Sequence, residues 1–134
     1  MIVVDANVLV YFWAGGPGAP LAEAVLQRDP TWIAPLLWRS EFRSAVLKLV
    51  RAGRLTAEHA SAWTRDAEIQ MAGREYSVES HAVLTLAVRS GCSAYDCEYV
   101  ALADDLDLPL VTFDDEVARA FPARALAPEA FLRD

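Results

Sequence analysis

The chain has 134 residues, 54% of them hydrophobic, and this length and composition fit one domain with a substantial core. Twelve basic residues against nineteen acidic ones give a net charge of −7, which argues against broad electrostatic attraction to nucleic acid or to an anionic membrane. Two cysteines are too few for a disulfide framework or a four-cysteine zinc site, and without a signal peptide or a long apolar run the protein is expected to be cytoplasmic, with no membrane attachment.

The first twelve residues, MIVVDANVLVYF, predict a strand that ends at an acidic side chain. Residues 2–4 are apolar without alternation, which is typical of a strand buried on both faces at the centre of a parallel sheet. Asp5 follows directly, at the carboxyl end of the strand, where open α/β sheets bind their ligands. A helix is expected over residues 8–13, and a simple capping role for Asp5 or Asn7 explains the same residues equally well at this point.

A second acid lies on the third predicted helix. After a short second helix, residues 31–34 (TWIA) predict a strand, and the spacing over residues 36–50 is helical. The apolar stripe of that helix consists of Trp38, Phe42, Ala45, Val46 and Leu49. Glu41 lies on or beside this stripe, and acids are rarely buried without a partner. Glu41 therefore either contributes to a polar site, pairs with Arg39 or Arg43, or lies at a solvent edge.

Two more helices are expected before the next acid. Thr56 can cap the first of them, which carries Ala60, Trp63 and Ala67. The second covers about residues 80–89 and ends before Gly91. The side chains expected to face inward from it are Val83, Leu84, Ala87 and Val88.

A third acid belongs to a central helix, predicted in the segment SAYDCEYVALADDL. Residues 99–103 are apolar on every side of this helix. Asp96 shares a face with Tyr99 and with part of that apolar run, which points its carboxylate inward. Ser93 and Asp96 also fit a capping box, although that motif prefers Glu or Gln at its last position.

The fourth acid follows another short strand. Residues 109–113 (PLVTF) repeat the opening pattern and lead to Asp114, and Asp115 is expected at the start of a further helix. Residues 124–132 suggest a last strand and a closing helical turn. The alternation predicts an α/β fold with a central, mostly parallel sheet of four to five short strands flanked by helices. Asp5 and Asp114 should then open on the same side of the sheet, within reach of the two acids on helices.

Four clustered carboxylates indicate metal chemistry. Like charges about 5 Å apart repel by roughly 3 kcal/mol per pair at an effective dielectric constant of 20. Such a cluster needs cations or raised pKa values, and hard oxygen ligands suit Mg²⁺ or Mn²⁺. Cations of this kind activate water and stabilise charge on a phosphodiester, so the residues predict a metal-dependent nuclease.

Rival sites lack essential residues. The segment GGPGAP has no following Lys and Ser or Thr of a phosphate-binding loop, and His59 and His81 are isolated and expected to be exposed. Receiver domains and haloacid-dehalogenase-type phosphatases also place acids at strand ends, but they use a catalytic lysine. The only lysine here, Lys48, is expected in mid-helix and far from any strand end.

Four segments occur in the order DANVLV, WRSEFRSA, SAYDCEYVALA and PLVTFD. With them the chain resembles a PIN domain over nearly its whole length, in particular a toxin nuclease of the VapC type. The resemblance implies Mg²⁺ or Mn²⁺ as cofactor and single-stranded or structured RNA as substrate. It implies that the metal is held by Asp5, Glu41, Asp96 and Asp114.

The resemblance also implies supporting residues and partners. Asn7 and Thr112 match positions that orient the carboxylates by hydrogen bonding. A homodimer is expected, together with a small antitoxin protein whose tail occludes the acidic pocket. Arg39, Arg43 and also Arg74 are candidate contacts to RNA phosphate, although pairing with the chain's own acids explains them at least as well.

Several alternatives stay open at this stage. Cys97, beside the third acid, has either a packing or a redox role, and packing is favoured because nothing nearby indicates a depressed thiol pKa. The chain could instead be a housekeeping RNA-processing PIN nuclease. It could also be a catalytically weak interaction module that uses the apolar surface of Trp13, Trp32, Trp38 and Trp63.

Overall fold

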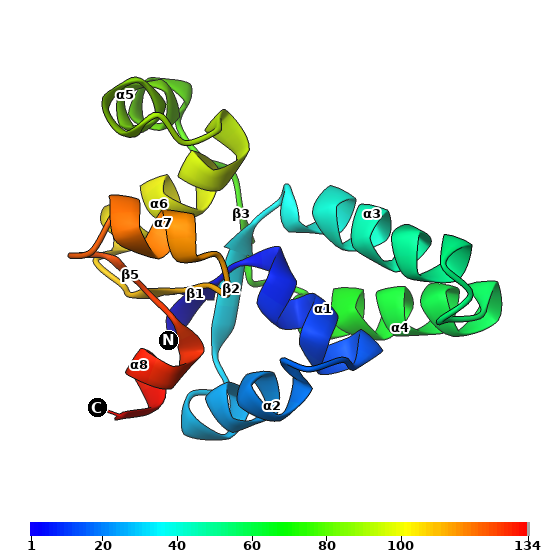
Figure 1. The fold of residues 1–134 in the computed structure, drawn as a ribbon. Coiled ribbons are helices and arrows are strands. Elements are labelled where there is room, and N and C mark those ends of the chain that lie inside the picture. The colour runs from blue at the N-terminus through cyan, green and yellow to red at the C-terminus, as the bar shows by residue number, and fades with distance from the viewer. Residues whose placement is uncertain (134) are drawn as a thin grey trace.

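A parallel sheet forms the centre of the computed structural model, which describes residues 1–133 (Figure 1). Its strands are β1 Ile2–Val4, β2 Trp32–Pro35, β3 Glu75–Tyr76, β4 Leu110–Val111 and β5 Ala125–Leu126. They lie in the order β3-β2-β1-β4-β5, and every neighbouring pair is parallel. The predicted α/β class with a sheet of four to five short strands is confirmed.

Helices cover both faces of this sheet. They are α1 Ala6–Ala14, α2 Ala19–Arg28, α3 Trp38–Arg51, α4 Ala57–Gln70, α5 Ser80–Ser90, α6 Ala94–Leu106, α7 Asp115–Ala120 and α8 Pro128–Arg133. Figure 1 shows α1 and α2 on one side of the sheet and α6 and α7 on the other, while α3 and α4 project from it as an antiparallel pair. Within residues 1–133 no helix has the length and apolar character needed to cross a bilayer.

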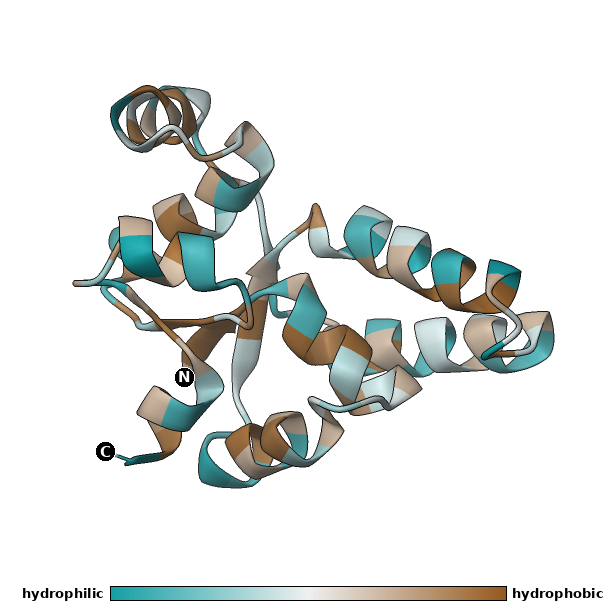
Figure 2. Ribbon diagram, viewed as in Figure 1, coloured by the Kyte–Doolittle hydropathy of each residue, from teal (hydrophilic) through white to brown (hydrophobic). Residues whose placement is uncertain are grey.

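The core lies where the central strand meets α6. All three residues of β1 are buried, and so are residues 99–103 of α6, as the sequence predicts. Figure 2 shows this concentration of hydrophobic residues at the strands and the more hydrophilic outer surface of α3 and α4. Since β1 is the middle strand, the residue that follows it emerges at the centre of the carboxyl edge of the sheet.

The elements differ from the expectations in two places, of which one is an omission and the other an error. The strand β3 has only two residues and was not predicted, because so short a segment carries no detectable periodicity. On α5, Leu84 and Val88 do not face inward: they are 58% and 87% exposed, and Leu86 is buried in their place beside Val83. This helix packs mainly on α6 and lies away from the sheet, so only a narrow stripe of it is covered (Figure 1).

Candidate functional site

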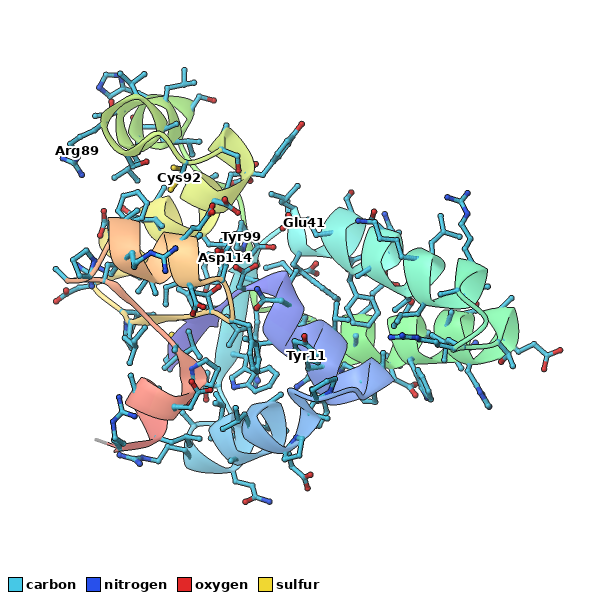
Figure 3. The ribbon with its side chains drawn as sticks, viewed as in Figure 1. Tyr11, Glu41, Arg89, Cys92, Tyr99 and Asp114 are labelled. Carbon is cyan, nitrogen blue, oxygen red and sulfur yellow. The ribbon has the colours of Figure 1, made fainter. Side chains whose placement is uncertain are left out.

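The four predicted acids line one groove beside the carboxyl edge of the sheet. Asp5 follows β1 and Asp114 follows β4, while Glu41 and Asp96 lie in the first turns of α3 and α6. The groove has a volume of about 630 Å³ and is also lined by α1 and by the turn after it. Figure 3 shows Glu41 on the α3 side of the groove and Asp114 on the α7 side.

Asp5 is the most buried of these acids. Only 9% of the residue is exposed, and the Thr112 hydroxyl donates to its Oδ2 atom at 2.8 Å. Burial raises the pKa of Asp5 to about 7, against the lowering effect of the Thr112 hydrogen bond, and the charges of Glu41 and Asp96 add to the rise. Although Asp5 occupies the N-cap position of α1, its side chain makes no capping hydrogen bond, so the capping explanation of this residue is wrong.

Thr112 and Asn7 connect the ends of β1 and β4. Thr112 Oγ1 accepts from the Asp114 backbone N–H at 3.0 Å and from Asn7 Nδ2 at 3.5 Å. Asn7 Oδ1 in turn accepts from the backbone N–H of Phe113 at 3.2 Å. Asn7 and Thr112, the residues expected to orient carboxylates, thus hold the loop that carries Asp114 close to Asp5 at the end of β1.

Glu41 is held by a tyrosine that sequence reasoning missed. Tyr99 is buried, and its hydroxyl donates to Glu41 Oε1 at 2.6 Å. Burial raises the pKa of Glu41, the Tyr99 hydrogen bond opposes this, and the charge of Asp96 adds to it. A buried tyrosine hydroxyl needs a partner, so the position of Tyr99 three residues after Asp96 was a usable signal.

The remaining two acids combine a local role with a place in the groove. Ser93 Oγ accepts from the backbone N–H of Asp96 at 3.0 Å, which caps α6. Burial raises the pKa of Asp96, and the charges of Asp114 and Glu116 contribute. Asp114 does cap α7, because its Oδ1 atom accepts from the Glu116 backbone N–H at 2.9 Å. Asp115 is exposed at the start of α7, as expected.

The donor set of the groove fits a hard divalent cation. Within residues 1–133 no three His, Cys, Asp or Glu side chains are already placed to hold a metal ion. The acids nevertheless lie within electrostatic reach of one another, since the pKa values of Asp5, Glu41 and Asp96 are each raised in part by another member of the set. A bound Mg²⁺ or Mn²⁺ would relieve this repulsion through a few carboxylate oxygens and retained water.

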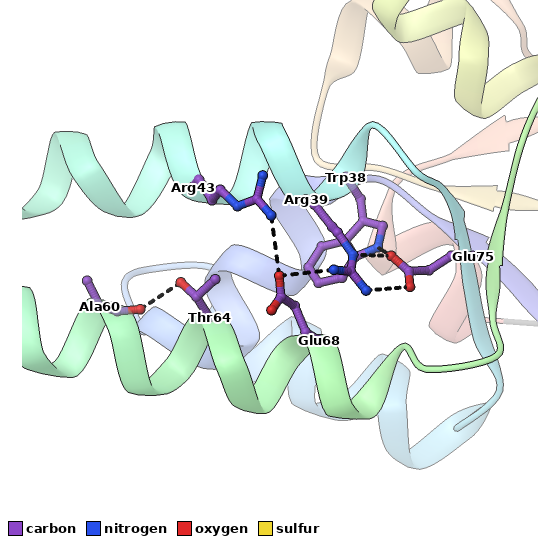
Figure 4. A network of polar contacts seen from close by, with 7 residues as sticks. All are labelled: Trp38, Arg39, Arg43, Ala60, Thr64, Glu68 and Glu75. Atoms are coloured by element: carbon purple, nitrogen blue, oxygen red, sulfur yellow. Dashed lines mark hydrogen bonds and ion pairs between the residues drawn. The ribbon is translucent and has the colours of Figure 1, made fainter.

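The arginines proposed as phosphate contacts lie elsewhere. Arg39 forms a two-pronged ion pair with Glu75, at 2.6 and 2.8 Å, and both Arg39 and Arg43 approach Glu68 (Figure 4). Arg74 donates to the Pro30 carbonyl. None of the three arginines lines the acidic groove. Their contact with RNA stays a prediction, and RNA phosphate would have to compete with these partners for them.

Two other cations do line the groove. Lys48 and Arg54 lie at the end away from the sheet, where α3 finishes. Lys48 lies in the last turn of α3 rather than in mid-helix as expected, and it lines the same groove as the four acids. The missed signal is its spacing: Lys48 comes seven residues after Glu41, two helical turns further along the same face.

Cys97 packs in the core. It is fully buried, its Sγ atom lies 3.9 Å from Ser90 Oγ, and burial raises the pKa of the thiol. This environment favours the protonated thiol, in keeping with the packing role.

Comparisons with known proteins agree with this architecture. The PIN domain family matches residues 2–121. Ribonuclease VapC1 of Mycobacterium tuberculosis is 31% identical over 119 residues, which cover 88% of this chain and 89% of the relative.

Solved structures also share the fold. PAE2754 from Pyrobaculum aerophilum has a TM-score of 0.78 at 24% identity, over 98% of this chain and 93% of that one. A toxin–antitoxin complex from Klebsiella pneumoniae contains a chain with a TM-score of 0.71 at 14% identity, over 96% and 98%.

Proposed function

Because the chain belongs to the PIN domain family, we propose that it is a Mg²⁺- or Mn²⁺-dependent endoribonuclease and the toxin of a toxin–antitoxin pair. The observation that carries the proposal is the groove in which Asp5, Glu41, Asp96 and Asp114 meet. The relative named as a ribonuclease supports RNA as the substrate, since its similarity extends over nearly the whole of both chains.

The four carboxylates would hold the cation, and the rest of the chain keeps them in place. A bound divalent cation makes water more acidic and stabilises the charge that develops on a phosphodiester. Thr112 fixes Asp5, and Tyr99 fixes Glu41, so two of the acids have little freedom to turn away. Such partners of metal-binding carboxylates commonly change metal affinity or activity tenfold or more, as a rough guide.

Replacing one acid tests the catalytic assignment. Asp96→Asn keeps the size of the side chain and the backbone cap from Ser93 but removes one anionic ligand. We expect cleavage of labelled RNA in the presence of Mn²⁺ to be lost while the far-UV circular dichroism is unchanged. Asp105→Asn is the matched control, because Asp105 is exposed on the same helix and outside the acidic groove. Wild-type cleavage by the Asp96→Asn variant would refute the assignment.

The melting temperature with and without Mn²⁺ distinguishes a metal-dependent enzyme from a protein-interaction module. A cation that binds only the folded protein stabilises it by about 2.7 kcal/mol at a hundred times its Kd, and the melting temperature rises as a result. We expect millimolar Mn²⁺ to stabilise the wild-type protein and to have a smaller effect on Asp96→Asn. Equal melting temperatures with and without Mn²⁺ would favour the interaction module.

We also infer an antitoxin and a second copy of the chain as partners, with action in the cytoplasm. The shared fold with a chain of a toxin–antitoxin complex supports the first. The second is supported by an apolar patch on α5, where the exposed side chains Leu84 and Val88 lie four residues apart on one face of the helix. Leu36 and Leu84 line the same surface hollow, so this patch extends across more than one element.

A further inference from the structure

The acidic groove has a cationic end. Lys48 and Arg54 line it together with the four acids, and both are exposed. Lys48 lies seven residues beyond Glu41 on α3, so the cationic end is about 10 Å from Glu41 along the helix axis. Ser44 and Ala45 line the groove between them, and their small side chains leave the path along the helix open.

Neither cation is engaged by the chain's own acids. Within residues 1–133, the structure shows no ion pair for Lys48 or Arg54, whereas Arg39, Arg43 and Arg124 are all paired with carboxylates. Other arginines also lack an ion pair, but they do not line this groove. Ion pairing within the chain therefore does not explain why Lys48 and Arg54 line the groove that carries the four acids.

The way α3 ends places the backbone of Arg54 beside the last turn of the helix. Gly53 has a positive φ of 73°, its N–H donates to the Val50 carbonyl, and the N–H of Arg54 donates to the Leu49 carbonyl at 2.9 Å. This pair of hydrogen bonds is the Schellman motif, which reverses the chain at a helix end. It brings Arg54 next to Leu49, which is itself a wall of the groove.

The charge of the molecule makes these two cations significant. With a net charge of −7 and four acids in the groove, an RNA strand approaching the site meets repulsion unless local positive charge offsets it. A phosphate at the acidic end would be close to the cation-binding carboxylates. A neighbouring phosphate of the same strand would then reach the cationic end of the groove.

We propose that Lys48 and Arg54 form a phosphate subsite that holds the single-stranded RNA backbone beside the bond to be cleaved. The inference rests on the proposed ribonuclease function and names the residues that position its substrate. Contacts of this kind carry no sequence information, so the subsite sets affinity and register on the strand and leaves base choice to other parts of the groove.

Binding measured without cleavage tests the subsite. Lys48→Gln and Arg54→Gln are each introduced into the Asp96→Asn protein, and fluorescence anisotropy follows a labelled oligouridine over a range of KCl concentrations in Mg²⁺. We expect each substitution to weaken binding by about threefold or more and to reduce the slope of log affinity against log salt by about 0.7. Arg51→Gln is the matched control, because Arg51 is an exposed cation near the end of α3 that does not line the groove.

Two results would overturn the subsite. One is unchanged affinity and salt slope in both variants, which would leave an acidic protein tail as the remaining partner for the two cations. The other is an equal loss in Arg51→Gln, which would show diffuse attraction rather than a defined contact. The Mn²⁺ shift in melting temperature of Lys48→Gln and Arg54→Gln, measured with Asp96 intact, should equal that of the wild type. Because no cleavage is needed, the binding result stands even if the wild-type protein does not cut RNA.

Discussion

At Asp5, burial and electrostatics both oppose the ionised form that a metal ligand needs. The side chain is 9% exposed, and its pKa is raised to about 7, first by burial and then by neighbouring acids. The protein therefore keeps a carboxyl group that weakens its own fold whenever it ionises without a cation. The metal binding proposed for Asp5 would therefore be coupled to folding stability at this one residue.

The coupling predicts the behaviour of Asp5→Asn in EDTA. A raised folded-state pKa means that the carboxyl group contributes fully to stability below its unfolded pKa of 3.8, and that this contribution is lost as the pH rises towards 7. The loss amounts to about 4 kcal/mol at most, and the asparagine variant should not show it. Urea unfolding at about pH 8 should find Asp5→Asn more stable than the wild type, with the difference vanishing towards about pH 4. Asp115→Asn, on an exposed residue, should show no comparable gain, and a less stable Asp5→Asn at the higher pH would contradict the argument.

Sequence reasoning found the acids of the site but not its cations or its tyrosine. An acid at the end of a buried strand, such as Asp5, or on the inner face of a helix, such as Glu41, breaks the apolar pattern and is therefore visible. Lys48 and Arg54 break no pattern, because an exposed cation near a helix end is what any solvated surface presents. Tyr99 was hidden for the opposite reason: it fits the apolar run around it, and only the structure shows its hydroxyl bonded to Glu41.

Among the elements, the base of the α3–α4 pair is fastened to β3 by one acid. Glu75 accepts from Trp38 Nε1 at 2.8 Å and forms the ion pair with Arg39 (Figure 4). The hydrogen bond from Arg39 lowers the pKa of Glu75, and Trp38 adds to the effect. This acid links the start of α3 to the edge strand that sequence reasoning missed.

Glu75→Gln should therefore loosen this junction. We expect a loss of about 1–2 kcal/mol in the free energy of unfolding, at the low end for a charged hydrogen bond because Arg39 is 37% exposed. Because the folded-state pKa is lowered, the wild-type advantage is present above the unfolded pKa of 4.5 and is lost as the pH falls through the lower folded-state value. Chemical unfolding over this range measures the difference. Glu68→Gln is the control, and its longer contacts, 3.4 and 3.5 Å, predict a smaller loss.

Two glycines at helix boundaries are needed for different reasons. A Cβ at Gly18 would lie 2.8 Å from the Tyr11 ring and 3.0 Å from Phe113, whereas a Cβ at Gly53 meets no atom within 4 Å. Gly18→Ala should cost about 1–3 kcal/mol through overpacking, and Tyr11→Leu should reduce that cost in the double variant. Gly53→Ala should cost about 1 kcal/mol through its positive φ alone, with no rescue by Tyr11→Leu. Thermal unfolding of the three single and two double variants checks both mechanisms, and rescue at Gly53 would show that the distinction is wrong.

The pattern of the elements was largely predictable because most of them carry their own period or boundary signal. Thr56 and Ser93 cap their helices with side-chain hydrogen bonds, and Gly91 ends α5 in the left-handed conformation, all as expected. The inward face of α5 could not be predicted, because its sequence is apolar on several sides and the choice depends on how much of the helix α6 covers. Leu84 and Val88 are the residues left over by that choice.

For the whole molecule, the exposed side chains of Leu84 and Val88 predict a concentration-dependent dimer. If the patch on α5 joins two copies, Leu84→Asp combined with Val88→Asp should yield a monomer, because two buried charges would oppose each other across a symmetric interface. Multi-angle light scattering measures the mass directly. Ile69→Asp is the matched control, since Ile69 is an exposed apolar residue on α4, away from the patch. A dimer that survives the double substitution would place the interface elsewhere.

The bond between Thr112 and Asp5 spans 107 positions of the chain. During synthesis Asp5 is made more than a hundred residues before its hydrogen-bond donor Thr112 and before the acid at position 114. A nascent chain can form α1 to α4 early, yet the groove has no complete wall until β4 has paired with β1. Folding during synthesis can therefore complete the helices on one side of the site before the acidic groove itself exists.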